Sequence, residues 1–137
     1  MKKNLLVCAS LLALCHASII AGLEKACNPD GNPATWDMVN IANLSLGGEG
    51  YEDDILSRAL DTASRAGGVA CVVAAGNEGP AKLTIGSPAS SREAITVAAV
   101  ERDGKSMAFF SSRGPTRGFG QAKPDLSPKK CARCFRR

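Results

Sequence analysis

Glycine-rich and acidic residues that could carry chemistry follow an apolar run in the middle of the chain. Gly47-Gly48-Glu49-Gly50 precedes a helical pattern, and a glycine-rich loop in that position can bind phosphate. This loop lacks the Walker lysine and a complete dinucleotide fingerprint, and Asp53 and Asp54 would repel phosphate. We therefore interpret the two aspartates as helix-start residues rather than as an acid–base pair.

Histidine and cysteine offer little further chemistry. The single histidine, His16, lies in the apolar N-terminal segment, and we interpret it as incidental. Cys131 and Cys134 form one CxxC pair without a second pair or a histidine partner, whereas a structural zinc site needs four ligands. We expect no metal there. Cys71 lies within an apolar run and is expected to be a small buried core residue.

The elements that must position these residues follow from hydrophobic periodicity and from turn-forming residues. Helices are predicted at residues 18–26 and 52–66, and strands at residues 38–46, 69–75 and 94–100. The second strand is almost wholly apolar, as in a parallel strand buried on both faces. This order predicts a βαβ unit in an α/β fold, an incomplete three-layer arrangement with helices flanking a parallel sheet. Such sheets bind ligands at the carboxyl ends of their strands.

Six segments of the chain, in order, resemble the subtilisin-like serine proteases, or subtilases. They are NLSLGG (residues 43–48), VAAGNEGP (73–80), SPA (87–89), AITVAAV (94–100), FSSRGP (110–115) and KPD (123–125). The resemblance extends over residues 18–127. It implies part of a domain that hydrolyses peptide bonds, and it implies a cis peptide bond before Pro88.

The resemblance also implies roles for single residues. Asn77 would be the catalytic residue, donating its side-chain amide to the oxyanion of the tetrahedral intermediate. The backbone of Ser45, Leu46 and Gly47 would pair with an extended peptide as an added strand. Small residues would leave room for a large apolar substrate side chain in a pocket lined by Gly47, Gly48, Ala74, Ala75 and Gly76. Taken alone, Asn77 is best interpreted as an ordinary turn residue, and the ordered series of matching segments favours the functional role.

The catalytic triad of the subtilases has no evident counterpart in the sequence. The family uses Asp, His and Ser in that order; the first two would precede the matched segment and the serine would follow it. Gly104-Lys105-Ser106-Met107-Ala108 resembles the serine motif but lies before FSSRGP, so Ser106 is predicted to be a solvent-exposed turn residue. Because a triad works as a unit, we expect the chain alone to be inactive. The family often binds calcium, but no carboxylate cluster supports such a site, and no cofactor is predicted.

Composition sets the expected domain organisation. The 137 residues suit one small domain, and 45% of them are hydrophobic, enough for a core. Residues 1–17 are predicted to be a secretory signal peptide, too short for a stable membrane span, which would make the protein secreted; the alternative is a helix that continues into Ile19, Ile20 and Leu23. Residues 18–127 would be the partial catalytic domain. The basic tail at 128–137 is expected to be disordered and not to bind nucleic acid, because no recognition motif accompanies it.

Three functions stay open on this basis. The first is a piece of a secreted serine endopeptidase that acts on extended peptides or proteins. The second is a non-catalytic module that binds a peptide or a protease propeptide through residues 45–47. The third is one part of a split protease that a second chain completes. Flanking sequence with upstream Asp and His motifs and a downstream serine motif would favour the first.

Overall fold

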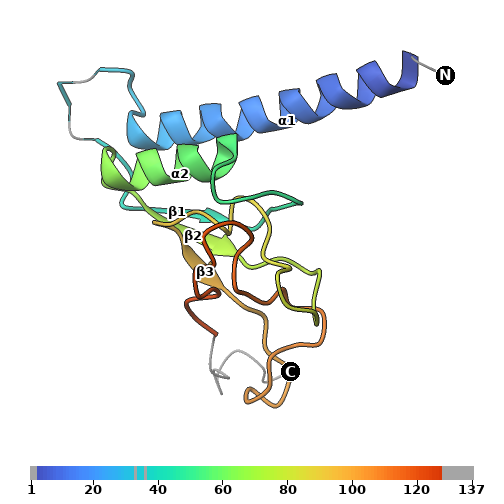
Figure 1. The fold of residues 1–137 in the computed structure, drawn as a ribbon. Coiled ribbons are helices and arrows are strands. Elements are labelled where there is room, and N and C mark those ends of the chain that lie inside the picture. Colours follow the sequence, from blue (N-terminus) through green and yellow to red (C-terminus); the bar gives the residue numbers. More distant parts are fainter. Residues whose placement is uncertain (1–2, 33, 36, 128–137) are drawn as a thin grey trace.

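The computed structural model describes residues 3–32, 34–35 and 37–127 (Figure 1). Its elements, in chain order, are α1 (Lys3–Cys27), β1 (Ile41–Leu44), α2 (Ile55–Arg65), β2 (Ala70–Ala74) and β3 (Ile95–Val97). The strands form one parallel sheet in the order β1-β2-β3. The α/β prediction is confirmed, and each strand is shorter than predicted because the flanking residues leave the ladder for loops. The basic tail lies outside the described residues.

Helix α2 ends within one residue of the predicted limit but begins at Ile55, three residues later than predicted. Asp54 is its N-cap residue, and its carboxylate accepts a hydrogen bond of 2.9 Å from the Ser57 N–H. The helix ends at Arg65, and Gly68 follows it with a φ of 67°, a conformation that glycine adopts without strain. Leu56, Leu60 and Ala63 lie on one buried face of α2. This face packs against β2, so the helix that connects β1 to β2 also covers the sheet.

Helix α1 is one continuous element across position 17, where the leader peptide was predicted to end. The apolar N-terminal segment and the helix predicted at residues 18–26 are therefore one helix in this structure, and cleavage after residue 17 stays a prediction. Helices α1 and α2 lie side by side over the same face of the sheet (Figure 1). Among the described residues, no helix combines the length and apolar character that crossing a membrane requires.

The core lies between the sheet and the two helices. Leu60 and Cys71 are fully buried there, and the buried Leu44 and Val73 lie beside them. The prediction that Cys71 is a buried core residue is confirmed. Cys27 at the end of α1 packs against this cluster, and desolvation, with a smaller contribution from Cys71, raises the pKa of its thiol.

The opposite face of the sheet is bare, contrary to the prediction that β2 is buried on both faces. Ala70 and Ala74 of β2 are exposed and Val72 is only half-buried. Ile41 of β1 is 65% exposed, and Ile95 of β3 is 38% exposed. Side chains alternate between the two faces of a strand, and both helices lie on the other face. The described part of the chain therefore covers the apolar side chains on only one face of β2.

The segment after β3 is anchored by two buried charged residues. Lys123 donates hydrogen bonds to the Ala94 carbonyl (2.5 Å) and to the Asp125 carboxylate (2.7 Å). Glu52, which is 2% exposed, accepts hydrogen bonds from the Thr116 hydroxyl and from the Phe119 N–H. A buried carboxylate or ammonium needs such partners to offset its lost hydration. These contacts hold residues 94–125 against the sheet and the start of α2 without further strands.

Candidate active site

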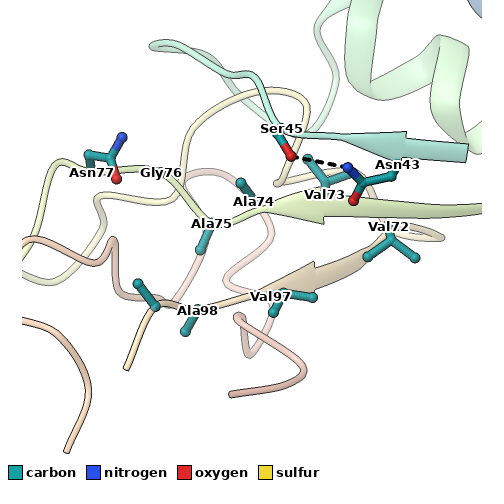
Figure 2. Close-up of a pocket in the computed structure, with 11 residues that line it drawn as sticks. Asn43, Ser45, Val72, Val73, Ala74, Ala75, Gly76, Asn77, Val97 and Ala98 are labelled. Atoms are coloured by element: carbon teal, nitrogen blue, oxygen red, sulfur yellow. Dashed lines mark hydrogen bonds between the residues drawn. The ribbon is translucent and has the colours of Figure 1, made fainter. Parts of the chain in front are cut away.

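The predicted site residues gather at the carboxyl ends of β1 and β2 (Figure 2). The chain passes from β1 into Ser45 and from β2 into Ala75, Gly76 and Asn77. A cavity of about 300 Å³ lies between these loops and the end of β3, and both Ser45 and Asn77 line it. Its other lining residues are Asn43, Val72, Val73, Ala74, Ala75, Gly76, Val97, Ala98 and Ala99. The structure thus brings the predicted strand segment and the predicted oxyanion donor to one cavity.

Residues 45–47 continue β1 without pairing to the sheet. The last ladder pair of β1 is Leu44 with Val73, and no backbone hydrogen bond joins residues 45–47 to any described residue. Pairing resumes at Gly48, whose N–H and carbonyl exchange two 3.0 Å hydrogen bonds with Ser87. Ser45, Leu46 and Gly47 are exposed. This short stretch is an open, extended backbone edge bounded by two paired positions.

Hydrogen bonds that involve Ser112 hold the loop that carries Asn77. The Glu78 carboxylate folds back to accept hydrogen bonds from the Asn77 N–H (2.8 Å) and from the fully buried Ser112 hydroxyl (2.8 Å). Ser112 returns the contact, because its Oγ accepts from the Glu78 N–H at 3.1 Å and its N–H donates to the Gly76 carbonyl at 3.0 Å. Asn77 itself is exposed, and its carboxamide projects from the loop beyond Gly76 (Figure 2).

Gly76 has a specific conformational reason to be glycine. Its φ of 108° lies in a region that side chains disfavour, and a Cβ there would overlap the Glu78 carboxylate and come within 2.6 Å of Ser112 Oγ. The tight turn brings Asn77 directly beyond the end of β2. A residue with a side chain could not take this position without displacing Glu78 and Ser112.

The pocket predicted for the substrate side chain is narrow. Its expected walls, Gly47, Gly48, Ala74, Ala75 and Gly76, do face one another. The free space between them is about 10 Å³, close to that of one water molecule. Glu78 and Ser87 also line this space, and the Gly48–Ser87 hydrogen bonds hold its two sides together. The expected room for a large apolar group is therefore absent from this conformation.

A larger hollow on the other side of residues 46–48 escaped the sequence prediction. Its volume is about 410 Å³, and its lining residues are Cys15, His16, Ile19, Leu46, Gly47, Gly48, Glu49, Leu56 and Ser87. The N-terminal segment was predicted to be a leader peptide and was therefore not expected beside the site. The helical spacing of Ile19 and Leu23 was the signal that the same helix packs on the domain.

The remaining candidates for chemistry lie apart from the cavity. Ser106 is exposed in the turn before Met107, and its hydroxyl donates a 2.8 Å hydrogen bond to Asp103, which confirms the predicted turn position. His16 lines the hollow beside Leu46 rather than the cavity of Asn77. The Ser87–Pro88 bond is cis, as the resemblance implied. In the described part of the chain, no group of three or more His, Cys, Asp or Glu side chains is placed to hold a metal.

Comparisons with known proteins agree with this geometry. The chain is 40% identical over 126 residues to the serine protease AprX of Bacillus subtilis, a match that covers 80% of this chain and 27% of AprX. It is 42% identical over 85 residues to the minor extracellular protease Vpr of the same organism, covering 61% of this chain and 9% of Vpr. Among solved structures, sphericase matches with a TM-score of 0.60 and 32% identity, covering 72% of this chain and 31% of sphericase.

These matches place the chain within part of a larger domain. A psychrophilic protease of known structure shares 31% identity with a TM-score of 0.61, and the match covers 74% of this chain but 33% of that protease. The chain thus spans about a third of the solved relatives and about a quarter of AprX. The model of the subtilase family matches residues 15–129, which include every element except the first turns of α1. The chain therefore belongs to the subtilase family of serine proteases.

Proposed function

We propose that this chain supplies the peptide-binding edge and the oxyanion donor of a subtilase active site. The observation that carries the proposal is the unpaired backbone of residues 45–47, whose first residue, Ser45, lines the same cavity as Asn77. The Asn40 carbonyl accepts from the Ala70 N–H, so even-numbered residues of β1 direct their polar groups toward β2. Ser45 and Gly47 then direct theirs toward the open edge, where an extended peptide adds as a further strand.

The two hollows fit the alternating side chains of such a peptide. The apolar hollow beside Leu46 would accept one side chain, and the cavity in front of Asn77 would accept the peptide carbonyl and its neighbour. Asn77 would stabilise the negative charge that develops on that carbonyl oxygen during attack. The narrow pocket between Gly47 and Gly76 has room for no more than a small group in this conformation.

The nucleophile and base would come from outside the described residues. The Ser106 hydroxyl donates to Asp103 in a turn, whereas His16 lies on α1 in the hollow beside Leu46. A complementing polypeptide with the triad would supply both groups, and the isolated chain would be inactive. The relative Vpr is named as extracellular, which supports secretion as the proposed location. The second candidate function is a module that binds peptides without catalysis, which the separate positions of Ser106 and His16 favour.

Peptide binding at residues 45–47 can be tested by titrating the ¹⁵N-labelled full chain with an unstructured peptide of about eight apolar residues. We expect chemical-shift changes at the amides of Ser45 and Gly47, which gain partners on strand addition, and at the Leu46 amide between them. The same peptide with N-methyl groups at alternate positions lacks the necessary donors and should leave those amides unchanged. Shifts elsewhere on the chain without shifts at these three amides would contradict the proposal.

A further inference from the structure

Asp54 makes more contacts than a helix N-cap requires. Its Oδ1 accepts from the Ser57 N–H at 2.9 Å, the ordinary capping bond, and also from the Ser87 hydroxyl at 2.7 Å. Its Oδ2 accepts from the Tyr51 N–H at 3.1 Å. One carboxylate therefore joins the start of α2, the turn before it, and a loop 33 residues further along the chain.

Ser87 carries this connection to the peptide-binding edge. It is 5% exposed, and its backbone exchanges both hydrogen bonds with Gly48, the residue directly after the open stretch 45–47. Its hydroxyl also lies 3.3 Å from Ser57 Oγ, which in turn lies 3.2 Å from Ser90 Oγ. The hydroxyls of Ser57, Ser87 and Ser90 form a buried network in which Asp54 is the charged acceptor. Bonds to a charged acceptor are stronger than neutral ones.

Gly50 shows how closely this arrangement is packed. A Cβ at Gly50 would overlap both the Asp54 carboxylate and the Ser87 Cβ. The turn between Gly48 and Tyr51 therefore lies directly on the Asp54–Ser87 pair. A shift of either side chain toward the turn would displace the turn and, with it, Gly48.

We infer that Asp54, acting through Ser87, is a positioning residue that fixes Gly48 and thereby holds the open edge at residues 45–47 in its extended form. This inference rests on the proposed peptide-binding function. The Asp54 carboxylate then has two roles: it caps α2, and through Ser87 it fixes the end of the binding edge. An edge that is already extended loses less conformational entropy when a peptide pairs with it.

Asp61 is a matched control on the same helix. Its Oδ1 accepts from the Ser91 hydroxyl at 2.6 Å and from the Glu93 N–H at 3.0 Å. It thus ties the same loop to α2 in the same way as Asp54, but at the far end from Gly48. A general weakening of the link between loop and helix would appear in variants of either residue.

The test compares the full chain with Asp54→Ser, Ser87→Ala and Asp61→Ala. Serine is a good N-cap but is too short to reach Ser87 and Tyr51, so Asp54→Ser keeps the cap and removes the other contacts. Amide hydrogen exchange at Gly48 and Ser87 should accelerate about tenfold in Asp54→Ser and Ser87→Ala, whereas exchange at Leu60 in α2 should stay within twofold. Asp61→Ala should leave exchange at Gly48 within twofold.

Affinity for the peptide used above supplies the second measurement. Asp54→Ser and Ser87→Ala should weaken binding about tenfold, and Asp61→Ala should not. Unchanged exchange at Gly48 in Asp54→Ser, or equal effects of Asp54→Ser and Asp61→Ala, would overturn the inference. If the unmodified chain shows no peptide-induced shifts at residues 45–47, the proposed function fails; the exchange data then still decide whether Asp54 fixes Gly48.

Discussion

Asn77 illustrates how single residues prepare a site at the end of a strand. Its backbone is fixed by the Glu78 carboxylate, and that carboxylate is fixed by the buried Ser112 hydroxyl. The Asn77 side chain stays exposed at the cavity. A donor that is held in place before the reaction stabilises developing charge without a reorganisation cost. Ser112, in the FSSRGP segment, thus supports the turn that presents Asn77. This role is not evident from the position of Ser112 in the sequence.

The role of Asn77 can be measured in an active host. Residues 18–127 of this chain would replace the matching segment of AprX, and Asn77→Ala would be introduced into the chimera. We expect kcat to fall about 10²–10³-fold with KM nearly unchanged; this magnitude is the one known for an oxyanion-hole asparagine in subtilisin itself. Asn43→Ala is the matched control, because Asn43 lines the same cavity but bonds to Ser45 Oγ at 3.0 Å. Equal losses of kcat in the two variants would show that Asn77 has no special role.

At the scale of elements, α2 joins the core to the site. Its buried face packs on β2, and its N-terminus carries Asp54, so the helix that stabilises the sheet also positions the binding edge. Leu60 lies at the centre of that face and is fully buried. Helix α1 packs along α2 and adds Leu23 to the same core. Stability and site geometry are therefore coupled through one helix.

Leu60→Ala should destabilise the chain by about 2–5 kcal/mol, because it removes buried methyl groups and leaves a cavity that close packing cannot refill. Urea unfolding followed by circular dichroism gives the free energy of unfolding. Arg58→Ala, at an exposed position of the same helix, should change it by no more than about 0.5 kcal/mol. A Leu60 variant as stable as the Arg58 variant would mean that this helix face does not pack on the sheet in solution.

On the scale of the whole molecule, one face of the sheet carries apolar side chains that no described element covers. Parallel sheets are normally covered on both faces, and here Ile41, Val72, Ile95 and Val97 lie on an uncovered one. Contiguous exposed apolar surface of this kind marks a place where other protein surface binds. The match to the solved relatives covers about a third of their length, which agrees with a face that other parts of a subtilase would cover.

We therefore expect the full chain to self-associate through this face when no other polypeptide covers it. Ile41→Gln should lower the association constant about tenfold or more in sedimentation experiments, because a largely exposed isoleucine would no longer be buried in the complex. Ile55→Gln is the matched control, since Ile55 is 64% exposed and Ile41 is 65% exposed, but Ile55 lies on α2. Equal effects of the two substitutions would show that association does not use the sheet face.

Much of the fold could be predicted from the sequence because its signals are local. Acidic residues before Ile55 and the glycines after Ala66 marked the limits of α2, and apolar runs marked β2 and β3. The order of the family motifs indicated Asn77 and residues 45–47 as site residues. The strand limits were predicted too wide, since hydrophobicity does not show where a strand leaves its ladder. The continuity of α1 was given only as the alternative, because a basic start followed by apolar residues also describes a leader.

By itself, the sequence determined the family, the succession of helices and strands, and the turn at Gly76 that presents Asn77, because each depends on residues that are neighbours in the chain. Only the tertiary structure decided which surfaces are open. The Glu78–Ser112 contact narrows one pocket, α1 forms the wall of another, and Asp54 reaches Ser87 beside Gly48. These contacts join residues that are more than 25 positions apart. Side chains so far apart meet only after the sheet and helices have packed, so no local pattern encodes them.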